Sequence, residues 1–257
     1  MSREFLAVEP YGAKGKIGLI NVGPNPTPVP DFYRMIPAGV IVNECKIHEG
    51  PQVASEADEL GKRAVQAAEL LAEGDPDVIA FTCTASAMSV GPEADYEQIT
   101  AMEKVTHGIP CTTTTTGCFN AFKFLGWKKF VMASPYVQPV VDRFIRVLNA
   151  KGYEILKSET LEIVYLDELR KTPTSKTYEV AMRAFVPEAD GIFIPCTTFR
   201  AIDVIERLEK ETGKPVITSN QASLWECLRL IGIDEPIEGF GELLRRPGRT
   251  SFKGFPK

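Results

Sequence analysis

Residues 77–84 read Asp-Val-Ile-Ala-Phe-Thr-Cys-Thr and match residues 190–197, Asp-Gly-Ile-Phe-Ile-Pro-Cys-Thr, in length and pattern. A second matching pair follows in the same order, Gly-Ile-Pro-Cys-Thr-Thr at residues 108–113 and Gly-Lys-Pro-Val-Ile-Thr-Ser at residues 213–219. Each copy then continues through a helical pattern to a turn that closes on glycine. Ordered self-similarity of this kind indicates a duplicated structural unit. The sequence therefore predicts two pseudo-symmetric lobes, each with its own parallel sheet.

Short apolar runs alternate with longer helical patterns along nearly the whole chain. The predicted strands cover residues 16–22, 40–47, 78–82, 111–113, 129–133, 154–163, 191–194 and 216–218. The clearest predicted helices cover residues 55–72, 137–150, 175–185, 199–212 and 222–231. Strand–helix alternation with short connections is typical of an α/β fold, in which helices cover parallel sheets. We expect a first lobe of residues 1–115 plus about 220–257 and a second lobe of residues 116–219.

Composition and charge exclude several classes of partner. The chain of 257 residues is 44% hydrophobic and 25% charged, as in an ordinary globular protein. Its net charge of −5 argues against nucleic acid or an anionic membrane, because either partner would favour a basic surface. No stretch approaches the roughly 18 to 20 apolar residues of a membrane helix. The N-terminal segment also lacks a signal-peptide pattern, so we expect a cytoplasmic protein.

The sequence shows no pattern typical of a bound cofactor or metal. The 6 cysteines form no Cys-x-x-Cys pair, and the 2 histidines are too few for imidazole-rich metal chemistry. No Gly-x-Gly-x-x-Gly phosphate motif follows the first predicted strand. We therefore expect neither a metal nor an organic cofactor, and no disulfide framework.

Two of the cysteines, Cys83 and Cys196, follow apolar strands and precede small hydroxyl residues. In open α/β sheets, ligands bind beyond the carboxyl ends of the strands. The turn or helix that begins there offers free backbone N–H groups to an anion. The same position favours the thiolate, so we expect both cysteines to have a lowered pKa. One location thus supplies a site for a carboxylate and an activated sulfur.

Two thiols that face each other across a cleft between the lobes can act without a cofactor. One can remove a proton from one face of an α-carbon while the other returns a proton to the opposite face. Alternatively, one sulfur adds to an activated double bond, the new single bond rotates, and elimination gives the other geometry. The remaining cysteines lie inside strand or helix patterns and are expected to be small core residues, namely Cys45, Cys111, Cys118 and Cys227.

The residues after each cysteine fit a carboxylate-binding pocket. Thr84 and Ala85 follow the first cysteine, and Thr197 and Thr198 follow the second, with hydroxyl and backbone N–H donors. The polar run at residues 112–116 ends another strand, and a solvated turn is its simplest interpretation.

Two further polar side chains follow predicted strands. Asn25 lies in a loop after the first strand, although the same local signals fit a proline-rich turn with this asparagine in the left-handed region equally well. Tyr136 follows the strand that ends near residue 133, where its phenol can donate into the cleft. A buried structural tyrosine is the equal alternative.

At these residues the sequence resembles the aspartate/glutamate racemase superfamily, in the branch of maleate cis–trans isomerases and arylmalonate decarboxylases. The features that carry this resemblance are Cys83-Thr84, Gly108-Ile-Pro-Cys-Thr-Thr, Ser134-Pro135-Tyr136, Cys196-Thr197-Thr198 and Gly239-Phe-Gly, and they lie within residues 16–244. The resemblance implies two lobes, each with a four-stranded parallel sheet, an active site between them, and association into an oligomer such as a dimer.

The resemblance also implies roles for particular residues. Cys83 is expected to be the nucleophile or base of the first lobe, with Cys196 as its partner on the second lobe. Asn25 matches a carboxylate-binding asparagine of the isomerases, and Tyr136 matches a phenol donor of both enzyme groups. The threonines after the two cysteines, with adjacent N–H groups, are expected to bind carboxylates. Because arylmalonate decarboxylases have glycine in place of the first-lobe cysteine, Cys83 favours an isomerase or racemase.

Two departures separate this chain from the isomerase pattern. The usual Ser-Ser-Asn-Thr reads Gly-Pro-Asn-Pro at residues 23–26, and Val164-Tyr165 stands where those enzymes have a second carboxylate-binding asparagine. The predicted function is an isomerase or racemase of a small carboxylate, most similar to maleate isomerase. The alternatives are a malonate-type decarboxylase that uses mainly Cys196, and a carboxylate-binding protein without catalysis.

Overall fold

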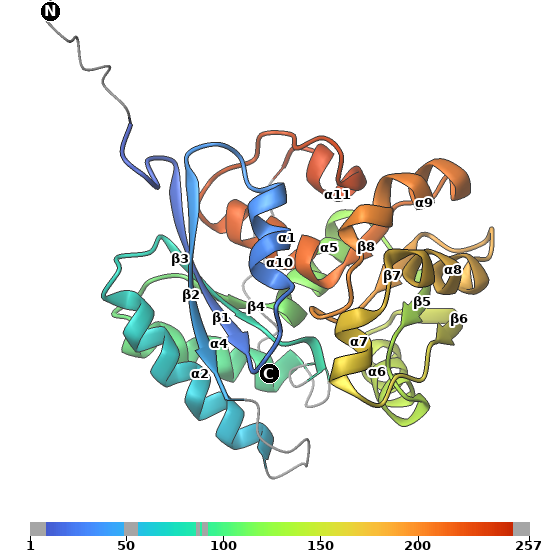
Figure 1. Cartoon of the computed structure of the whole chain (residues 1–257), viewed down its shortest axis with the longest axis horizontal. Coiled ribbons are helices and arrows are strands. Elements are labelled where there is room, and N and C mark those ends of the chain that lie inside the picture. The colour runs from blue at the N-terminus through green and yellow to red at the C-terminus, as the bar shows by residue number, and fades with distance from the viewer. Residues whose placement is uncertain (1–8, 49–55, 86–87, 89–91, 249–257) are drawn as a thin grey trace, which may run out of the picture.

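The fold contains two parallel sheets with the same strand order (Figure 1). A computed structural model describes residues 9–48, 56–85, 88 and 92–248. In these ranges, one four-stranded sheet has the order β2-β1-β3-β4 and the other the order β6-β5-β7-β8, with all neighbours parallel. The strands are β1 (Gly15–Val22), β2 (Val40–Ile47), β3 (Val78–Thr82), β4 (Cys111–Thr113), β5 (Lys129–Ser134), β6 (Glu154–Thr160), β7 (Ile192–Ile194) and β8 (Val216–Thr218). The predicted α/β fold with two similar four-stranded sheets is confirmed.

Helices connect the strands and cover both sheets, as right-handed parallel connections require. They are α1 (Pro28–Met35), α2 (Glu56–Ala72), α4 (Pro92–Val105), α5 (Thr114–Phe124), α6 (Gln138–Ala150), α7 (Leu166–Lys171), α8 (Thr174–Ala184), the 3₁₀ helix η1 (Ile202–Val204), α9 (Ile205–Thr212), α10 (Ser219–Leu230) and α11 (Gly241–Arg245). Helix α1 was not predicted because prolines open it. Proline fits the first turn of a helix, where its missing N–H needs no partner.

Three predicted element limits were wrong by three residues or more. The helix predicted from residue 222 begins at Ser219, where Thr218 caps it, and the backbone gives the reason for the other two. The strand predicted to continue to residue 163 ends at Thr160, before Glu162, whose φ of 55° is incompatible with an extended strand. The helix predicted from residue 199 begins only at Ile205, after a turn and the 3₁₀ helix. That turn follows Cys196, whose own φ of 97° directs the chain away from a helical path.

Helices α5 and α10 lie between the two sheets (Figure 1) and pack closely against each other. A Cβ atom at Gly117 would lie 2.8 Å from the carbonyl oxygen of Ala222, so only glycine permits this approach. Each helix contacts strands of both sheets, namely β3, β4 and β8. The limits of the two lobes within the chain stay a prediction.

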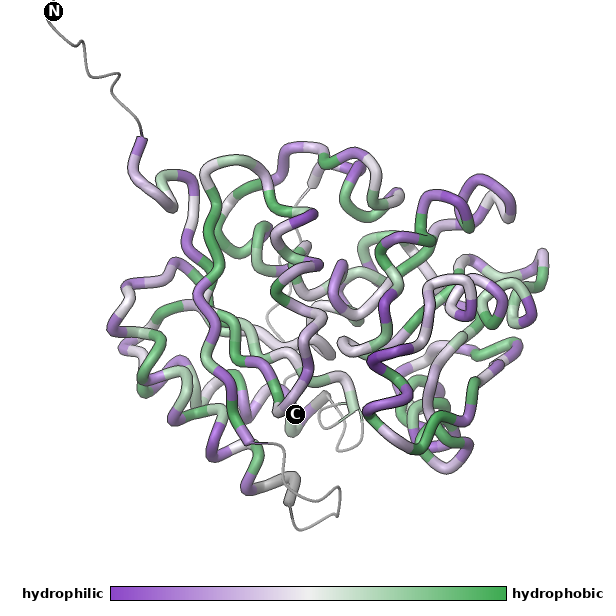
Figure 2. Tube along the Cα trace, viewed as in Figure 1, coloured by the Kyte–Doolittle hydropathy of each residue, from purple (hydrophilic) through white to green (hydrophobic). Residues whose placement is uncertain are grey.

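Hydropathy along the chain follows this architecture. In Figure 2 the strands are mostly hydrophobic, while the outer helices alternate between hydrophilic and hydrophobic residues. All of β3 and all but one residue of β1 are buried, as expected for parallel strands covered on both faces. Within the described residues, no helix combines the length and the apolarity that crossing a membrane requires.

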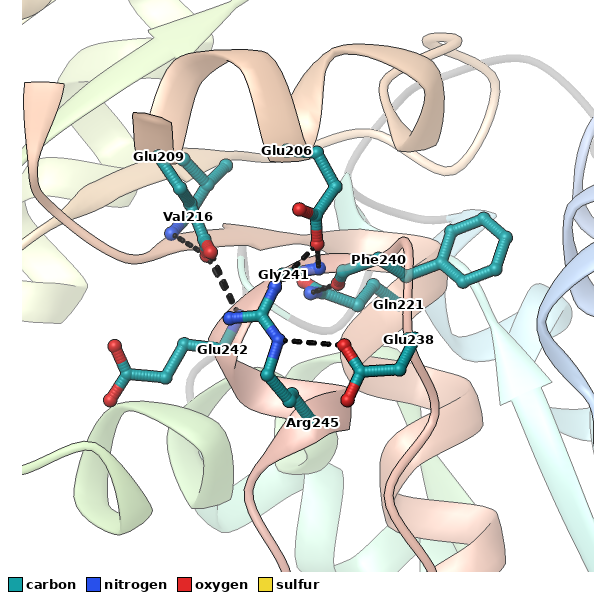
Figure 3. A network of polar contacts seen from close by, with 9 residues as sticks. All are labelled: Glu206, Glu209, Val216, Gln221, Glu238, Phe240, Gly241, Glu242 and Arg245. Atoms are coloured by element: carbon teal, nitrogen blue, oxygen red, sulfur yellow. Dashed lines mark hydrogen bonds and ion pairs between the residues drawn. The ribbon is translucent and has the colours of Figure 1, made fainter. Parts of the chain in front are cut away.

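A polar network fixes the C-terminal segment to the second sheet (Figure 3). Glu209 on α9 accepts hydrogen bonds from the backbone N–H groups of Val216, at 2.9 Å, and Glu242, at 2.9 and 3.0 Å. Gly241 donates its N–H to Glu206 at 2.8 Å. Arg245 then binds the same Glu206 carboxylate at 2.6 Å. These contacts join α9, β8 and α11 and hold the start of α11 in place.

We predict that Gly241→Ala destabilises the protein more than Gly239→Ala. Both glycines have a positive φ, but a Cβ at position 241 would lie 2.4 Å from Ile205, whereas no atom lies within 4 Å of one at position 239. The expected loss in unfolding free energy is about 1–2 kcal/mol for the Gly239 variant. For the Gly241 variant, overpacking against Ile205 adds a further loss of about 1–3 kcal/mol in unfolding free energy. Urea unfolding measures both, and equal losses would contradict the prediction.

We predict that Glu226→Gln makes the protein more stable at pH 8 but not at pH 4. Glu226 is buried between α5 and α10, where Asn120 donates to it at 2.8 Å, and burial raises its pKa from 4.5 to about 7. The native state therefore keeps a proton that the unfolded state has lost, so stability falls as the pH rises from 4.5 to 7. Glutamine does not titrate, so the variant lacks this fall of about 3 kcal/mol in the free energy of unfolding. Chemical unfolding at both pH values tests this, and a pH-independent difference would count against it.

Candidate active site

The carboxyl ends of strands from both sheets meet at one place. Cys83 directly follows β3, and Cys196 lies two residues after β7. Asn25 follows β1, Tyr136 follows β5, and Ser219 follows β8. Parallel strands direct their carboxyl ends to one edge of a sheet, so each sheet contributes the residues after its two central strands, and the second sheet adds Ser219 after its edge strand β8. Hydrogen bonds between these residues, described below, join the two sheets.

The Cys196 thiol is buried and surrounded by donors. The residue is 8% exposed, and its sulfur faces the Tyr136 hydroxyl, the Thr198 hydroxyl and the Thr198 N–H as donors. The Phe199 N–H also acts to lower the pKa of the thiol, while it donates to the Cys196 carbonyl oxygen at 3.2 Å. Its backbone N–H donates to the Ser219 hydroxyl at 3.0 Å. Burial outweighs these donors and raises the pKa of the thiol. The expected lowering of this pKa was wrong, and Cys196 rests as a neutral thiol.

The Tyr136 hydroxyl interacts with both candidate cysteines, through a hydrogen bond with Cys196 and electrostatically with Cys83. Burial, followed by Cys196 and then Cys83, holds the pKa of Tyr136 well above its usual value, while the Thr84 hydroxyl donates to the phenol oxygen. The aromatic ring packs against Phe144 with the centroids 5.2 Å apart. The ring is thus part of the core, and the hydroxyl remains protonated and faces the sulfurs.

The Asn25 loop binds the turn after Cys196. The Asn25 Nδ2 atom donates to Thr197 Oγ1 at 3.1 Å, and Thr27 Oγ1 donates to the Thr198 carbonyl at 3.1 Å. Asn25 Oδ1 accepts the Thr27 N–H at 3.1 Å, so the amide orientation is set. In this turn Gly23 has the positive φ, of 49°. Asn25 is not in the left-handed region, so the alternative interpretation of this asparagine was wrong. The amide and the threonine hydroxyl now satisfy each other, and a carboxylate would compete for both.

Thr84, Ala85 and Ser219 complete the surroundings of the sulfurs. Thr84 is buried, and its hydroxyl lies 2.9 Å from the Ser219 hydroxyl. Ala85 is half-buried and brings only backbone groups. Ser219 was not predicted as a site residue, although it ends the repeated segment 213–219. Its place directly after a strand of the second sheet is the sequence signal that identifies it.

Asp31 reaches the same turn from α1 through Asn220. The Asn220 amide donates to Asp31 Oδ2 at 2.8 Å and to the Thr197 carbonyl at 3.0 Å. Burial raises the pKa of Asp31 from 3.8 to about 6, despite the Asn220 hydrogen bond and the nearby Arg34. Arg34 also binds Asp203 on the second lobe at 2.6 Å. The lobes are therefore joined by polar contacts beside the site.

The threonine run at residues 112–116 is buried, so its interpretation as a solvated turn was wrong. Every residue in it is at most 5% exposed. The Thr113 and Thr116 hydroxyls donate to the buried Asp95 at 2.6 and 2.5 Å, and Thr113 also caps α5. The run is polar because it begins a buried helix and binds a carboxyl group.

The other cysteines lie in or against the core. Cys111, Cys118 and Cys227 are buried, and Cys45 is half-buried in β2. Burial raises the pKa of all four, to about 12 for Cys111. Their thiols remain protonated.

The segment that departs from the isomerase pattern is exposed. Val164 and Tyr165 have 69% and 73% of their surface accessible. They precede α7, from which Arg170 donates to the Pro24 carbonyl at 3.1 Å. Helix α7, which follows this segment, is therefore in contact with the Asn25 loop.

A hollow of about 790 Å³ lies elsewhere, at the α9–α11 end of the second lobe. Its walls are charged, and Glu206, Glu209 and Arg245 already bind one another or the backbone in the network of Figure 3. Within the described residues, no three histidine, cysteine, aspartate or glutamate side chains form a group that could hold a metal ion.

The profile of the arylmalonate decarboxylase family matches residues 52–244. The chain belongs to this family. It is 30% identical to the arylmalonate decarboxylase of Bordetella bronchiseptica over an alignment of 134 residues. This alignment covers 51% of this chain and only 55% of that enzyme. Over 181 residues it is 23% identical to the maleate isomerase of Geobacillus stearothermophilus, covering 68% and 71% of the two chains. The predicted resemblance to this branch is confirmed.

The fold of a solved relative agrees with this result. A cysteine-to-alanine variant of the maleate isomerase from Pseudomonas putida S16, solved with maleate, aligns with a TM-score of 0.84. The alignment covers 90% of this chain and 97% of that one at 18% sequence identity. The two proteins therefore share the whole two-sheet fold.

We predict that Tyr136→Phe slows alkylation of Cys196 about tenfold at pH 8. The variant removes the O–H that donates to the sulfur, so the pKa of the thiol rises further, and one pKa unit corresponds to tenfold less thiolate. Iodoacetamide labelling followed by peptide mass spectrometry measures the rate at this one cysteine. Tyr153→Phe is the matched control, because burial alone raises the pKa of Tyr153. Equal rates for the two variants would refute the predicted hydrogen bond.

Proposed function

We propose that this protein is a cofactor-independent isomerase or racemase of a small carboxylate, similar to maleate isomerase, with Cys83 and Cys196 as its catalytic pair. The observation that carries this proposal is the shared neighbour of the two sulfurs, the protonated Tyr136 hydroxyl. A purely structural cysteine needs no such donor. The match to maleate isomerases supports the same class of reaction.

In the addition route, the Cys83 thiolate attacks one alkene carbon of a cis-dicarboxylate. A carbon–sulfur bond forms, the π electrons move towards the neighbouring carboxylate, and the former double bond becomes single. After rotation the electrons return, the carbon–sulfur bond breaks, and the thiolate leaves from the trans isomer. No net proton or electron is consumed, so no co-reactant is needed.

In the racemase route, one sulfur accepts the proton of an α-carbon and the opposite thiol donates another. Cys196 is suited to the donating role because burial keeps its thiol neutral. The Tyr136 hydroxyl and the N–H groups of Thr198 and Phe199 then stabilise the thiolate that remains. The same buried thiol can protonate the carbanion of the addition route.

The substrate carboxylates are proposed to bind neutral donors. Asn25 Nδ2 and the hydroxyls of Thr84, Thr197 and Thr198 lie beside the sulfurs, and Ala85 adds backbone groups. In a buried site, aligned N–H and O–H donors stabilise developing negative charge strongly. The exposed Val164–Tyr165 segment replaces the second asparagine of the isomerases, which favours a substrate with only one tightly bound carboxylate.

A decarboxylase is the second candidate. It is favoured by the family profile, by the 30% identity to an arylmalonate decarboxylase, and by the neutral Cys196 thiol, which suits protonation of an enediolate after CO₂ leaves. This reaction needs Cys196 but not Cys83. A carboxylate-binding protein without turnover needs neither sulfur.

We predict cysteine-dependent turnover in proton NMR spectra recorded in D₂O under reducing conditions. The panel contains maleate, aspartate, glutamate, a hydantoin, and aryl- and alkylmalonates. An isomerase or racemase loses activity in both Cys83→Ala and Cys196→Ala, whereas a decarboxylase retains it in Cys83→Ala. The double variant is the control for adventitious chemistry. Turnover that persists in the double variant, or stabilisation by a carboxylate without any turnover, would reject the proposed cysteine mechanism.

A further inference from the structure

Four groups at the junction of the sheets form a closed ring of hydrogen bonds. The Cys196 N–H donates to Ser219 Oγ at 3.0 Å, and Ser219 Oγ lies 2.9 Å from Thr84 Oγ1. The Thr84 hydroxyl is bonded to the Tyr136 hydroxyl, and the Tyr136 hydroxyl to the Cys196 sulfur. The ring thus starts at the backbone of Cys196, passes through both lobes, and returns to the sulfur of the same residue.

The number of available protons sets the direction of this ring. The Tyr136 O–H donates to the Cys196 sulfur, so its oxygen accepts from Thr84. Thr84 has one hydroxyl proton, so its own oxygen accepts from Ser219. Ser219 in turn donates its one proton to Thr84 and accepts the Cys196 N–H. All donors point the same way, an arrangement in which each hydrogen bond strengthens the next.

The Ser219 hydroxyl is not needed to cap α10. Ser219 is the first residue of α10, but the N-cap of that helix is Thr218, which forms a capping box with Gln221. Ser219 is 1% exposed, so its hydroxyl is shielded from solvent. The Ser219 hydroxyl also faces the Cys118 sulfur and acts to lower the pKa of that thiol, but burial dominates and Cys118 keeps its own proton. The Ser219 proton therefore remains available to Thr84 in the ring.

We propose that Ser219 is a positioning residue for Cys196. Through Thr84 and Tyr136 it directs the Tyr136 proton at the Cys196 sulfur. By accepting the Cys196 N–H it also holds Cys196 at its positive φ. The inference rests on the proposed cysteine chemistry and adds the residue that orients it. A φ of 97° is unfavourable for any residue except glycine, so a fixed acceptor for the N–H stabilises the conformation that presents the thiol. Ser219 meets both needs with one oxygen.

The test is the pH profile of Cys196 alkylation by iodoacetamide, followed by peptide mass spectrometry on the full chain. Ser219→Ala is expected to slow alkylation about tenfold at pH 8 and to move the midpoint upwards by about one unit, as loss of one donor pathway implies. Ser219→Thr, which keeps the hydroxyl, is expected to restore the profile. Tyr136 faces the sulfur, and Cys83 acts electrostatically on the Tyr136 hydroxyl, so the series is repeated with Cys83→Ala.

Ser223→Ala is the matched control. Ser223 lies one turn further along α10 and is equally buried. Its hydroxyl lies 2.9 Å from Thr114 Oγ1 and 2.8 Å from the backbone carbonyl oxygen of Ser219, and it bonds to none of the groups that form the ring. Its removal is expected to leave the Cys196 profile unchanged. A shift as large as that of Ser219→Ala would overturn the proposal, as would an unchanged profile in Ser219→Ala.

Thr84→Val keeps the inference testable if the Ser219 variants fold poorly, because it opens the ring at another point. The Thr84→Val and Ser219→Ala effects are expected to be non-additive in the double variant, since both act through one chain of donors. Additive effects would contradict the ring. Alkylation does not require turnover, so the positioning role can hold even if the panel of carboxylates is silent, and it can fail while turnover is observed.

Discussion

The close contact between α5 and α10 determines how the two sheets meet. At Gly117 the helices approach so closely that a side chain would collide with the Ala222 carbonyl oxygen. Helix α5 begins directly after β4, and α10 begins directly after β8. Packing these helices together therefore brings the carboxyl ends of both sheets to one place. The loops that carry the sulfurs, the phenol and the amide depend on this alignment.

The two sheets have the same strand order, but their loops carry different chemistry. Asn25 follows β1, and Tyr136 follows the equivalent strand β5, so an amide stands on one lobe and a phenol on the other. The cysteines occupy equivalent places, yet Cys83 is half-buried and Cys196 is buried. A duplicated scaffold thus holds two thiols in unequal environments. Such inequality suits a pair in which one sulfur attacks and the other carries a proton.

Burial governs the electrostatics around the site. It raises the pKa of Cys196, of Tyr136 and of Asp31, and for Asp31 it exceeds the effect of the nearby arginine. The resting site is consequently built from neutral thiol, phenol, amide and hydroxyl groups. Neutral donors in a buried place respond strongly to a new negative charge, whether it arises on a sulfur or on a substrate. Hydrogen-bond direction then matters more than formal charge, which explains the prominence of hydroxyl groups near the sulfurs.

The sequence by itself determined the α/β fold, the repeat and the positions of Cys83 and Cys196 at strand ends, because these follow from local apolar patterns and from their order along the chain. It could not determine the raised pKa of Cys196, since desolvation depends on what packs around the sulfur in the folded protein. The burial of residues 112–116 depended likewise on Asp95, and the role of Ser219 on Thr84. Contacts between residues distant in sequence decide burial and hydrogen-bond partners, so tertiary structure alone settled them.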